Sequence, residues 1–472
     1  MDFGILSVIP PLCTIALAII TKNVFLALMI GVLLGNLILD GGNVLAAFDD
    51  SLNGVINVFA SSSNTITLAS ILLIGAIIYI IEKAGGISGF VEVMVRKRAL
   101  IKSKKGANVF TWLLGVLIFT SGSLSCMIVG SVSRPINDAL KVPHEKAAFL
   151  VHSTSTPVCV LIPLSGWLAS MIGYLTSGGV AEGEAMSTLV KSIPLNFYCL
   201  LAVLGCLLFS LTGKDIGLMK KAEERALATG YLDDPKSNPS ASKGDEEISI
   251  DTDKPKAITL ILPLLSMIAG VIVTLLVTGG GNLLNGSGMQ ALLWGVFTAL
   301  VVLGIMVIVQ KIYTFGQFID NIFKGCSSML SIAAILMFAF TLSPIVSALG
   351  TGTYLSSIFE QFLIPALLPV LVFIMSCLLS FATGTSMGTM AIMSVIALPM
   401  AMNLDMSIPL VASAVWGGSI FGDHASPVSD TTIMSCATTG CNIIDHVKTQ
   451  APYCILFAAC TVIFYLIAGF VV

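Results

Sequence analysis

The chain has 472 residues, of which 56% are hydrophobic and only 10% are charged, and its formal net charge is −3. A soluble globular domain carries about 25% charged residues, so this composition excludes an ordinary soluble protein. Apolar runs of roughly 18 or more residues are typical of transmembrane helices, and the chain has about ten of them. The sequence therefore predicts a polytopic membrane protein.

The apolar segments follow one another with few interruptions. The second segment follows the first at once, without a small-residue cleavage site, so we expect no removable signal peptide. The eleven cysteines lie almost entirely in apolar runs and form no C-x-x-C pair, which argues against a disulfide framework or a metal cluster. We predict segments at 5–21, 24–39, 66–81, 107–133, 147–175, 194–213, 257–278, 291–310, 327–349, 362–402, 408–438 and 449–472.

Two of these segments, 107–133 and 362–402, have an unusual form: two apolar arms flank a tip rich in Ser, Thr and Gly. Non-helical backbone at membrane depth is tolerated only where protein or a water-filled cavity covers it. The pattern therefore predicts two re-entrant hairpins that enter and leave the membrane on the same face. Their tips would offer substrate contacts from Ser121, Ser123, Thr383, Thr385 and Ser386.

The basic residues predict the orientation. With both hairpins counted as re-entrant, ten crossings remain, and all but Lys191 of the 23 Lys and Arg residues fall on one side. Cytoplasmic loops of membrane proteins are enriched in Lys and Arg. We therefore expect that side to be cytoplasmic and both termini to lie outside.

The one long polar stretch, 214–256, mixes charges of both signs with Pro, Ser and Gly, as in a solvated cytoplasmic linker. It separates two similar halves: Phe119 and Gly122 match Phe381 and Gly384 at nearly the same offset as Pro157 matches Pro427. Because each half has an odd number of crossings, the halves would insert in opposite orientations. We predict an all-α fold with an inverted-topology repeat, 1–213 and 257–472, each half with five crossings, a re-entrant hairpin and a discontinuous helix.

The discontinuous helices are expected at 147–175 and 408–438, where Pro157 and Pro427 remove backbone donors. A break leaves unpaired carbonyl groups on one half-helix and unpaired N–H groups on the other. Hydroxyl and carbonyl oxygens near such a break suit a small hard cation such as Na⁺. The candidate ligands are Thr154, Ser155 and Thr156 at the first break and Ser426, Ser429 and Thr431 at the second.

Acidic residues point to the same place. Asp423 and Asp430 lie seven residues apart around Pro427, with His424 beside the first. An ionised side chain at mid-bilayer costs about 2.5–3.5 kcal/mol, so such residues are functional candidates. A carboxylate in a poorly hydrated cavity could hold either a proton or a cation, but not both. We predict a cation- and proton-binding site with Na⁺ at Asp423 and Asp430, assisted by His424, and a supporting role for His152.

The segments GDHASPVSDTTIMS and STSTPVCVLIPLSGW resemble the two signature segments of the NhaC-type sodium/proton antiporter family, which also contains malate–lactate exchangers. The resemblance implies a secondary transporter of the bacterial cytoplasmic membrane and, through the wider ion-transporter superfamily, a homodimer. It also implies elevator-type alternating access, in which the hairpins and broken helices move. Spans 24–39, 66–81, 291–310 and 327–349 would belong to the dimerisation scaffold.

The leading hypothesis is Na⁺/H⁺ antiport, with Na⁺ and H⁺ as transported ions and no cofactor. The alternative is Na⁺- or H⁺-coupled transport or exchange of a small organic anion or amino acid, which the hydroxyl-rich tips could seat. No nucleophile–base pair suggests an enzyme, and the basic runs serve topology rather than nucleic-acid binding. The expected partners are membrane lipid and a small ion or small-molecule substrate.

Overall fold

The computed structural model describes residues 3–21, 23–86, 89, 101, 103–119, 121–163, 165–235, 256–281, 286–362 and 364–471. Within these ranges all regular secondary structure is helical, which confirms the predicted all-α fold class. Parts of the basic stretch near residue 96 and of the polar stretch beyond residue 235 lie outside the described residues.

The helices of the first half run from the N-terminus to the short helix after α12. They are η1 (Gly4–Val8), α1 (Ile9–Thr21), α2 (Val24–Leu39), α3 (Val44–Ala60), α4 (Ser62–Lys83), α6 (Lys104–Leu117), α7 (Gly122–Ala139), α8 (His144–Ser153), α9 (Thr156–Leu161), α10 (Leu168–Ser177), α11 (Glu182–Ser192), η3 (Ile193–Leu195), α12 (Phe197–Thr212) and α13 (Gly217–Thr229).

The second half continues to the C-terminus. Its helices are α14 (Ile258–Thr278), α15 (Gly288–Val309), α16 (Phe315–Ser328), α17 (Leu330–Ala348), α18 (Thr351–Phe362), η5 (Pro365–Leu367), α19 (Leu368–Thr383), α20 (Ser386–Asn403), α21 (Ile408–Ala425), α22 (Asp430–Thr439) and α23 (Ile443–Val471).

Nine helical stretches of the described chain are long and apolar enough to cross a membrane. Together with the shorter apolar helix α2, they make this a multi-span membrane protein. The nine stretches are Gly4–Thr21, Ser62–Lys83, Phe197–Thr229, Ile258–Thr278, Gln290–Val309, Leu330–Ala348, Pro365–Thr383, Ser386–Asn403 and Ile443–Val471.

Local sequence explains where many helices begin and end. Side-chain oxygens of Asn23, Ser61 and Thr385 accept hydrogen bonds from the first turns of α2, α4 and α20, which satisfies otherwise unpaired N–H groups. Gly213 and Gly384 end α12 and α19 in the left-handed conformation that glycine adopts without steric cost. Polar and glycine residues between apolar runs thus divide the chain into short, capped helices.

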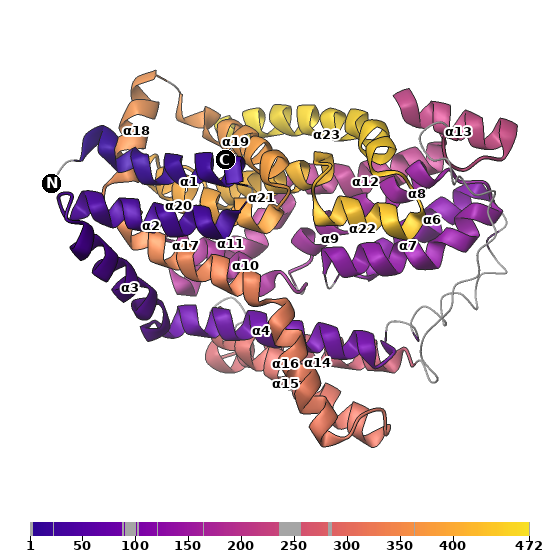
Figure 1. The fold of residues 1–472 in the computed structure, drawn as a ribbon, viewed down its shortest axis with the longest axis horizontal. Coiled ribbons are helices and arrows are strands. Elements are labelled where there is room, and N and C mark those ends of the chain that lie inside the picture. Colours follow the sequence, from indigo (N-terminus) through magenta and orange to yellow (C-terminus); the bar gives the residue numbers. More distant parts are fainter. Residues whose placement is uncertain are drawn as a thin grey trace.

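Figure 1 shows two regions of the molecule. Helices α4, α14, α15 and α16 lie together, and α4 packs against both α15 and α16. The helices of the two predicted hairpins and broken helices form the other region, in which α7 packs against α22 and α19 packs against α21. The two halves of the sequence therefore contact each other in both regions, through α4 in the first and through α7 and α22 in the second.

Two glycines on α21 allow the close approach of α19. A Cβ atom at Gly418 would come within 2.4 Å of the carbonyl oxygen of Phe373, and one at Gly422 would come within 2.4 Å of the nitrogen of Phe381. Small residues four apart are a common way for membrane helices to pack closely. This packing fixes the end of α21, which carries Asp423, against an arm of the second predicted hairpin.

The segment predicted as one broken helix, 147–175, divides twice. Helix α8 ends at Ser153 and α9 begins at Thr156, and a second interruption separates α9 from α10. Pro163 lies in the second interruption, where Ser165 donates a 2.6 Å hydrogen bond to the carbonyl of Cys159 and its oxygen accepts from the N–H of Trp167. A proline and a competing hydroxyl together explain why α9 has only six residues.

The first part of the polar stretch 214–256 is folded rather than extended. Lys146 at the start of α8 pairs with Asp215, and Arg225 of α13 pairs with Glu145 at 2.8 Å. His144 lies 3.1 Å from Asp138 and 2.9 Å from Asp233. The mixed charges that suggested a solvated linker thus form ion pairs that hold residues 215–233 against the start of α8.

Candidate functional site

Asp423 lies near the end of α21 with only 1% of its surface exposed. Its Oδ1 accepts a 2.6 Å hydrogen bond from Ser429, and its Oδ2 accepts hydrogen bonds from Thr431 at 2.8 Å and from Thr156 at 3.1 Å. Hydroxyl donors of this kind favour the ionised carboxylate. The first break supplies one donor and the second supplies two, so both breaks converge on this carboxylate.

The loop after α21 aims these hydroxyls. Pro427 lies between α21 and α22, and Ser429 caps the N-terminus of α22 by accepting from the N–H of Thr432. Thr432 donates to the carbonyl of Ser426 at 2.9 Å, which ties the two sides of the break together. The result is a compact turn in which Ser429 serves both as a helix cap and as a donor to Asp423.

Asp430 has a different environment. It is the first residue of α22, where a negative charge is favoured by the helix dipole. Its Oδ2 accepts a 2.9 Å hydrogen bond from Ser123 of α7, and its side chain is exposed to a cavity. The two carboxylates thus differ: Asp423 is enclosed, whereas Asp430 is accessible from the cavity.

This central cavity has a volume of about 450 Å³ and lies where the two predicted hairpin tips meet. Helices α4 and α17 contribute apolar residues on the opposite wall. The first turns of α7, α20 and α22 all reach it, so three helix N-termini converge on one space. The polar lining includes Ser121, Ser123, Thr156, Ser170, Ser328, Thr385, Ser386, Asp430 and Thr431.

Three buried histidines lie behind Asp423. His152 Nε2 is 3.0 Å from Thr431 Oγ1, and His152 Nδ1 is 3.1 Å from His446 Nε2. His424 Nε2 lies 3.1 Å from the backbone carbonyl of His152, and its Nδ1 lies 3.2 Å from the hydroxyl of Tyr198. A continuous set of polar contacts therefore leads from Asp423 to α23.

The structure brings some of the predicted site residues together and separates others. Ser429, Thr431 and Thr156 contact Asp423, Ser123 contacts Asp430, and Ser121, Thr385 and Ser386 line the cavity. The hydroxyls of the remaining residues bond to nearby backbone, and His424 faces Tyr198. Those hydroxyls belong to Thr154 (to Leu150), Ser155 (to His152), Ser426 (accepting from Val428) and Thr383 (to Leu379).

Sequence reasoning missed His446, Gln450 and Tyr198. His446 and Gln450 lie four residues apart on α23, so they share one helix face. Gln450 donates to the carbonyl of His424 at 2.9 Å, and its Nε2 lies 3.2 Å from His152 Nδ1. Two polar residues at helical spacing within an apolar span were the available signal.

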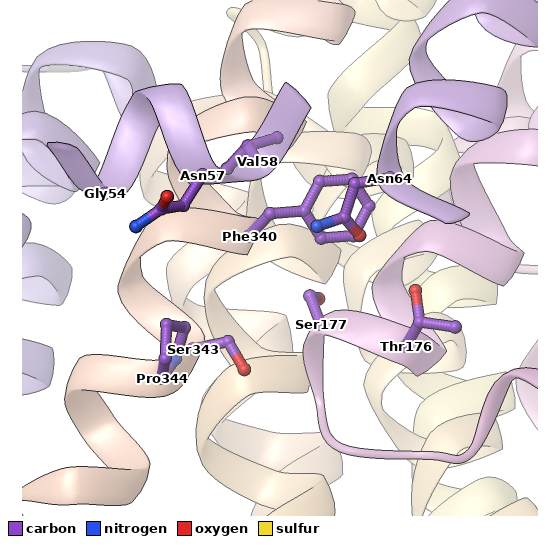
Figure 2. Close-up of a pocket in the computed structure, with 9 residues that line it drawn as sticks. All are labelled: Gly54, Asn57, Val58, Asn64, Thr176, Ser177, Phe340, Ser343 and Pro344. Carbon is purple, nitrogen blue, oxygen red and sulfur yellow. The ribbon is translucent and has the colours of Figure 1, made fainter. Parts of the chain in front are cut away.

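A second cavity of about 290 Å³ is also lined by α4, α10 and α17, as the central cavity is (Figure 2). Figure 2 shows side chains of α3, α4, α10 and α17 around it, among them Asn57, Asn64, Thr176 and Ser343. None of the nine described residues that line it carries a charge. It is therefore a less suitable place for a bare cation than the cavity beside Asp430.

The donor set at Asp423 suits an alkali cation better than a transition metal. Within the described ranges, no group of three or more His, Cys, Asp or Glu side chains is arranged to hold a metal ion. Carboxylate and hydroxyl oxygens, by contrast, are hard ligands of the type that small hard cations prefer. Asp423 supplies such oxygens, and the hydroxyls of Ser429, Thr431 and Thr156 lie within hydrogen-bond distance of it.

Residues 158–470 match the sequence profile of the Na⁺/H⁺ antiporter family. An uncharacterized protein of Haemophilus influenzae is 31% identical, with all of this chain and 92% of that protein aligned. The malate-2H⁺/Na⁺-lactate antiporter of Bacillus subtilis is 28% identical over 34% of each chain. The arginine/ornithine antiporter ArcD of Halobacterium salinarum is 28% identical over 43% of this chain and 40% of its own.

Among solved structures, the chain is similar to the YdaH transporter of Alcanivorax borkumensis. The TM-score is 0.57 at 13% identity, and the alignment covers 89% of this chain and 88% of that one. Identity at this level shows a shared fold and nothing finer. The family match confirms the resemblance that the two signature segments indicated.

Proposed function

The chain belongs to the Na⁺/H⁺ antiporter family, and from that premise we propose that it exchanges Na⁺ for H⁺ across the bacterial cytoplasmic membrane. One observation carries the proposal: Asp423 is enclosed, yet three hydroxyls from both helix breaks bond to its carboxylate. A buried charge persists only when it is paired or hydrogen-bonded. Such a carboxylate is poised to exchange one positive partner for another.

The mechanism is competition for Asp423. With Na⁺ bound, the carboxylate stays ionised and the hydroxyls of Ser429, Thr431 and Thr156 share their oxygens with the ion. With a proton bound, the carboxyl group is neutral and the cation leaves. Asp430, which is accessible from the central cavity, attracts the cation and passes it to Asp423. Because the two ligands exclude each other, movement of one is coupled to counter-movement of the other.

Alternating access follows an elevator-type movement in this proposal. The hairpins and broken helices carry Asp423, and α2, α4, α15 and α17 belong to the fixed scaffold through which two copies form a homodimer. Helix α6 has 14 residues, and at 1.5 Å per residue it is only about 21 Å long, shorter than the roughly 30 Å hydrocarbon core. That length favours a re-entrant arm. The inverted repeat of 1–213 and 257–472, with both termini outside, completes this arrangement.

Reconstituted protein tests the exchange directly. Proteoliposomes containing a trapped pH-sensitive dye receive an outward or inward Na⁺ gradient, with no organic solute present. We expect protons to move in the direction opposite to Na⁺. An imposed membrane potential should change the rate only if the numbers of Na⁺ and H⁺ ions exchanged per cycle differ. Absence of any proton movement under every ion gradient would exclude Na⁺/H⁺ exchange.

A second candidate is coupled transport of a small organic anion or amino acid. The central cavity, at about 450 Å³, falls within the 300–1,000 Å³ typical of small-molecule sites. The N-termini of α7, α20 and α22 favour a carboxylate, and Asp430 would suit an ammonium group. The relatives that exchange malate, lactate, arginine or ornithine support this alternative. A proton signal that requires an added metabolite would decide for it.

A further inference from the structure

His446 and Gln450 of α23 contact the broken helices behind the ion site. His446 Nε2 and Gln450 Nε2 lie 3.1 and 3.2 Å from His152 Nδ1. His152, His446 and Gln450 are each 0% exposed. A buried polar group is costly unless it is hydrogen-bonded, so the direction of each hydrogen bond here is strongly constrained.

The backbone carbonyl of His424 sets these directions. A carbonyl only accepts, so the Gln450 atom 2.9 Å from it is the donating amide nitrogen. The same nitrogen faces His152 Nδ1, which must therefore be the accepting nitrogen of that ring. A neutral imidazole has one donor and one acceptor, so His152 carries its proton on Nε2 and donates it to Thr431.

The remaining protons follow from this tautomer. Thr431 accepts from His152, so its own proton points to Asp423 Oδ2 at 2.8 Å. His446 must donate from Nε2 to His152 Nδ1, which leaves its Nδ1 as a free acceptor. That atom is buried and has no hydrogen-bond partner among the described residues. The hydrogen bonds that His446, His152 and Thr431 donate thus point in one direction, from His446 toward the carboxylate.

We propose that His446, His152 and Thr431 form a proton path to Asp423, an inference that rests on the proposed antiport function. A proton binds His446 at Nδ1, and His446 passes its Nε2 proton to His152 Nδ1. His152 passes its Nε2 proton to Thr431, and Thr431 passes its own to Asp423. Each group gains one proton and loses one, and only Asp423 changes charge. After the transfer each imidazole carries its proton on Nδ1, which on His152 faces the donating nitrogen of Gln450 and makes this tautomer the less stable one. Release of the Asp423 proton back along the same path restores the starting tautomers.

The surroundings favour a path over a purely structural cluster. His446 lies in the first turn of α23, next to exposed Ile444 and Lys448, at the end of the helix that we predict to be cytoplasmic. His446 Nδ1 is an open acceptor at the start of this path, and the buried Oε1 atom of Gln450 is likewise without a partner among the described residues, so the cluster has acceptors left over for a further proton. Gln450 is a positioning residue, because its donor holds His152 in the tautomer that points toward Asp423. Tyr198, His424 and Asp423 are the other ionisable groups that face this cluster.

Two transport modes separate a proton path from a structural role. Na⁺/H⁺ exchange requires proton transfer, whereas exchange of radioactive Na⁺ for unlabelled Na⁺ at equal pH does not. In proteoliposomes, His446→Asn should lower Na⁺/H⁺ exchange about a hundredfold or more, the range of general acid–base effects, and change Na⁺/Na⁺ exchange less than about twofold. Tyr198→Phe is the matched control, because it removes a buried hydrogen bond beside the path and should leave the ratio of the two modes unchanged.

Chemical rescue gives an independent measurement. His446→Ala should lose Na⁺/H⁺ exchange and regain part of it when imidazole is added, because imidazole can occupy the space and carry the proton. Wild-type-like Na⁺/H⁺ exchange in His446→Asn would overturn the path. Equal loss of both modes without rescue by imidazole would also overturn it, in favour of a structural role. Failure of the antiport function itself would be visible in the unmodified protein, which would then move no protons in response to Na⁺.

Discussion

Thr156 Oγ1 lies 3.1 Å from Asp423 Oδ2, and this hydrogen bond joins the two broken helices across 267 positions of the sequence. Thr156 is the first residue of α9, and Asp423 lies at the end of α21. The contact places one donor from the first half of the chain on a carboxylate of the second half. A movement that separates the halves at this point would break the site.

Replacing Thr156 with Val should weaken Na⁺ activation. A hydrogen bond to a charged group contributes about 1.5–3 kcal/mol, which corresponds to roughly a tenfold to hundredfold change in an equilibrium constant. We expect the Na⁺ concentration for half-maximal exchange in proteoliposomes to rise by about that factor. Thr156→Ser keeps the hydroxyl and is the control. Equal effects of Val and Ser would show that the methyl group, rather than the hydrogen bond, matters.

The two carboxylates should respond differently to neutralisation. Asp423→Asn removes the enclosed charge that both ions require, so we expect exchange to fall about a hundredfold or more. Asp430→Asn removes a charge from the cavity, so we expect the Na⁺ concentration for half-maximal exchange to rise about tenfold while the maximal rate stays nearly unchanged. Rates measured across a range of Na⁺ concentrations separate these effects. The reverse assignment would follow if Asp430→Asn abolished exchange and Asp423→Asn only weakened Na⁺ dependence.

Local chemistry accounts for much of what the sequence predicts. Pro157 and Pro427 lack backbone donors; Pro157 lies in the first turn of α9, where a missing N–H costs nothing, and α21 ends two residues before Pro427. The breaks beside Ser121 and Thr385 fall where Gly and short polar side chains interrupt the apolar runs, and Ser121 and Thr385 are the N-cap residues of α7 and α20. Neither signal depends on distant parts of the chain, which is why a single sequence carries it.

The difference in exposure between Asp423, which is buried, and Asp430, which faces the cavity, could not be predicted in the same way. Both residues flank the same proline, and only the packing of α22 against α7 decides which one is enclosed and which faces the cavity. His446 was hidden for a related reason. Its segment is mostly apolar, and its role depends on a contact with His152, which lies 294 positions away. The hydroxyls of Thr154 and Ser155 donate to backbone carbonyls of α8. Their positions in the sequence cannot distinguish such hydrogen bonds from ion binding.

Gly173 on α10 offers a test of the proposed movement. A Cβ atom there would come within 2.6 Å of Leu336 on α17 and 2.9 Å of Thr67 on α4. Ser170 lines the central cavity and Thr176 lines the second one, so Gly173 lies between these two lining residues on α10. Overpacking costs about 1–3 kcal/mol. Gly173→Val should therefore slow exchange roughly tenfold, because α10 must slide past α4 and α17.

Binding and transport must be measured separately for this variant. Na⁺ binding to purified Gly173→Val, followed by intrinsic tryptophan fluorescence or calorimetry, should stay close to that of the unmodified protein. Gly183→Val is the matched control, because a Cβ atom at Gly183 meets nothing within 4 Å. Unimpaired exchange in Gly173→Val would show that α10 does not move against these helices.

His144 should make the end of the protein that we predict to be cytoplasmic sensitive to alkaline pH. It lies ahead of the predicted span 147–175, and its backbone N–H donates to the carbonyl of Leu232. Burial alone would lower its pKa, but hydrogen bonds and charge from Asp138 and Asp233 outweigh burial and raise the pKa to about 9. The unfolded value is about 6.5, so protonated His144 stabilises the folded state.

The sign of the pH dependence follows from that upward shift. The stabilisation is fully present below about pH 6.5 and is lost as the pH rises through about 9, and it is on the order of 3 kcal/mol. Other groups titrate in this range, so the informative quantity is a difference between variants. His144→Asn should lose less apparent melting temperature between pH 7 and pH 10 than the unmodified protein. Parallel curves would mean that His144 is not charged in the folded state, and that Asp138 and Asp233 do not hold the segment after α13 through its charge.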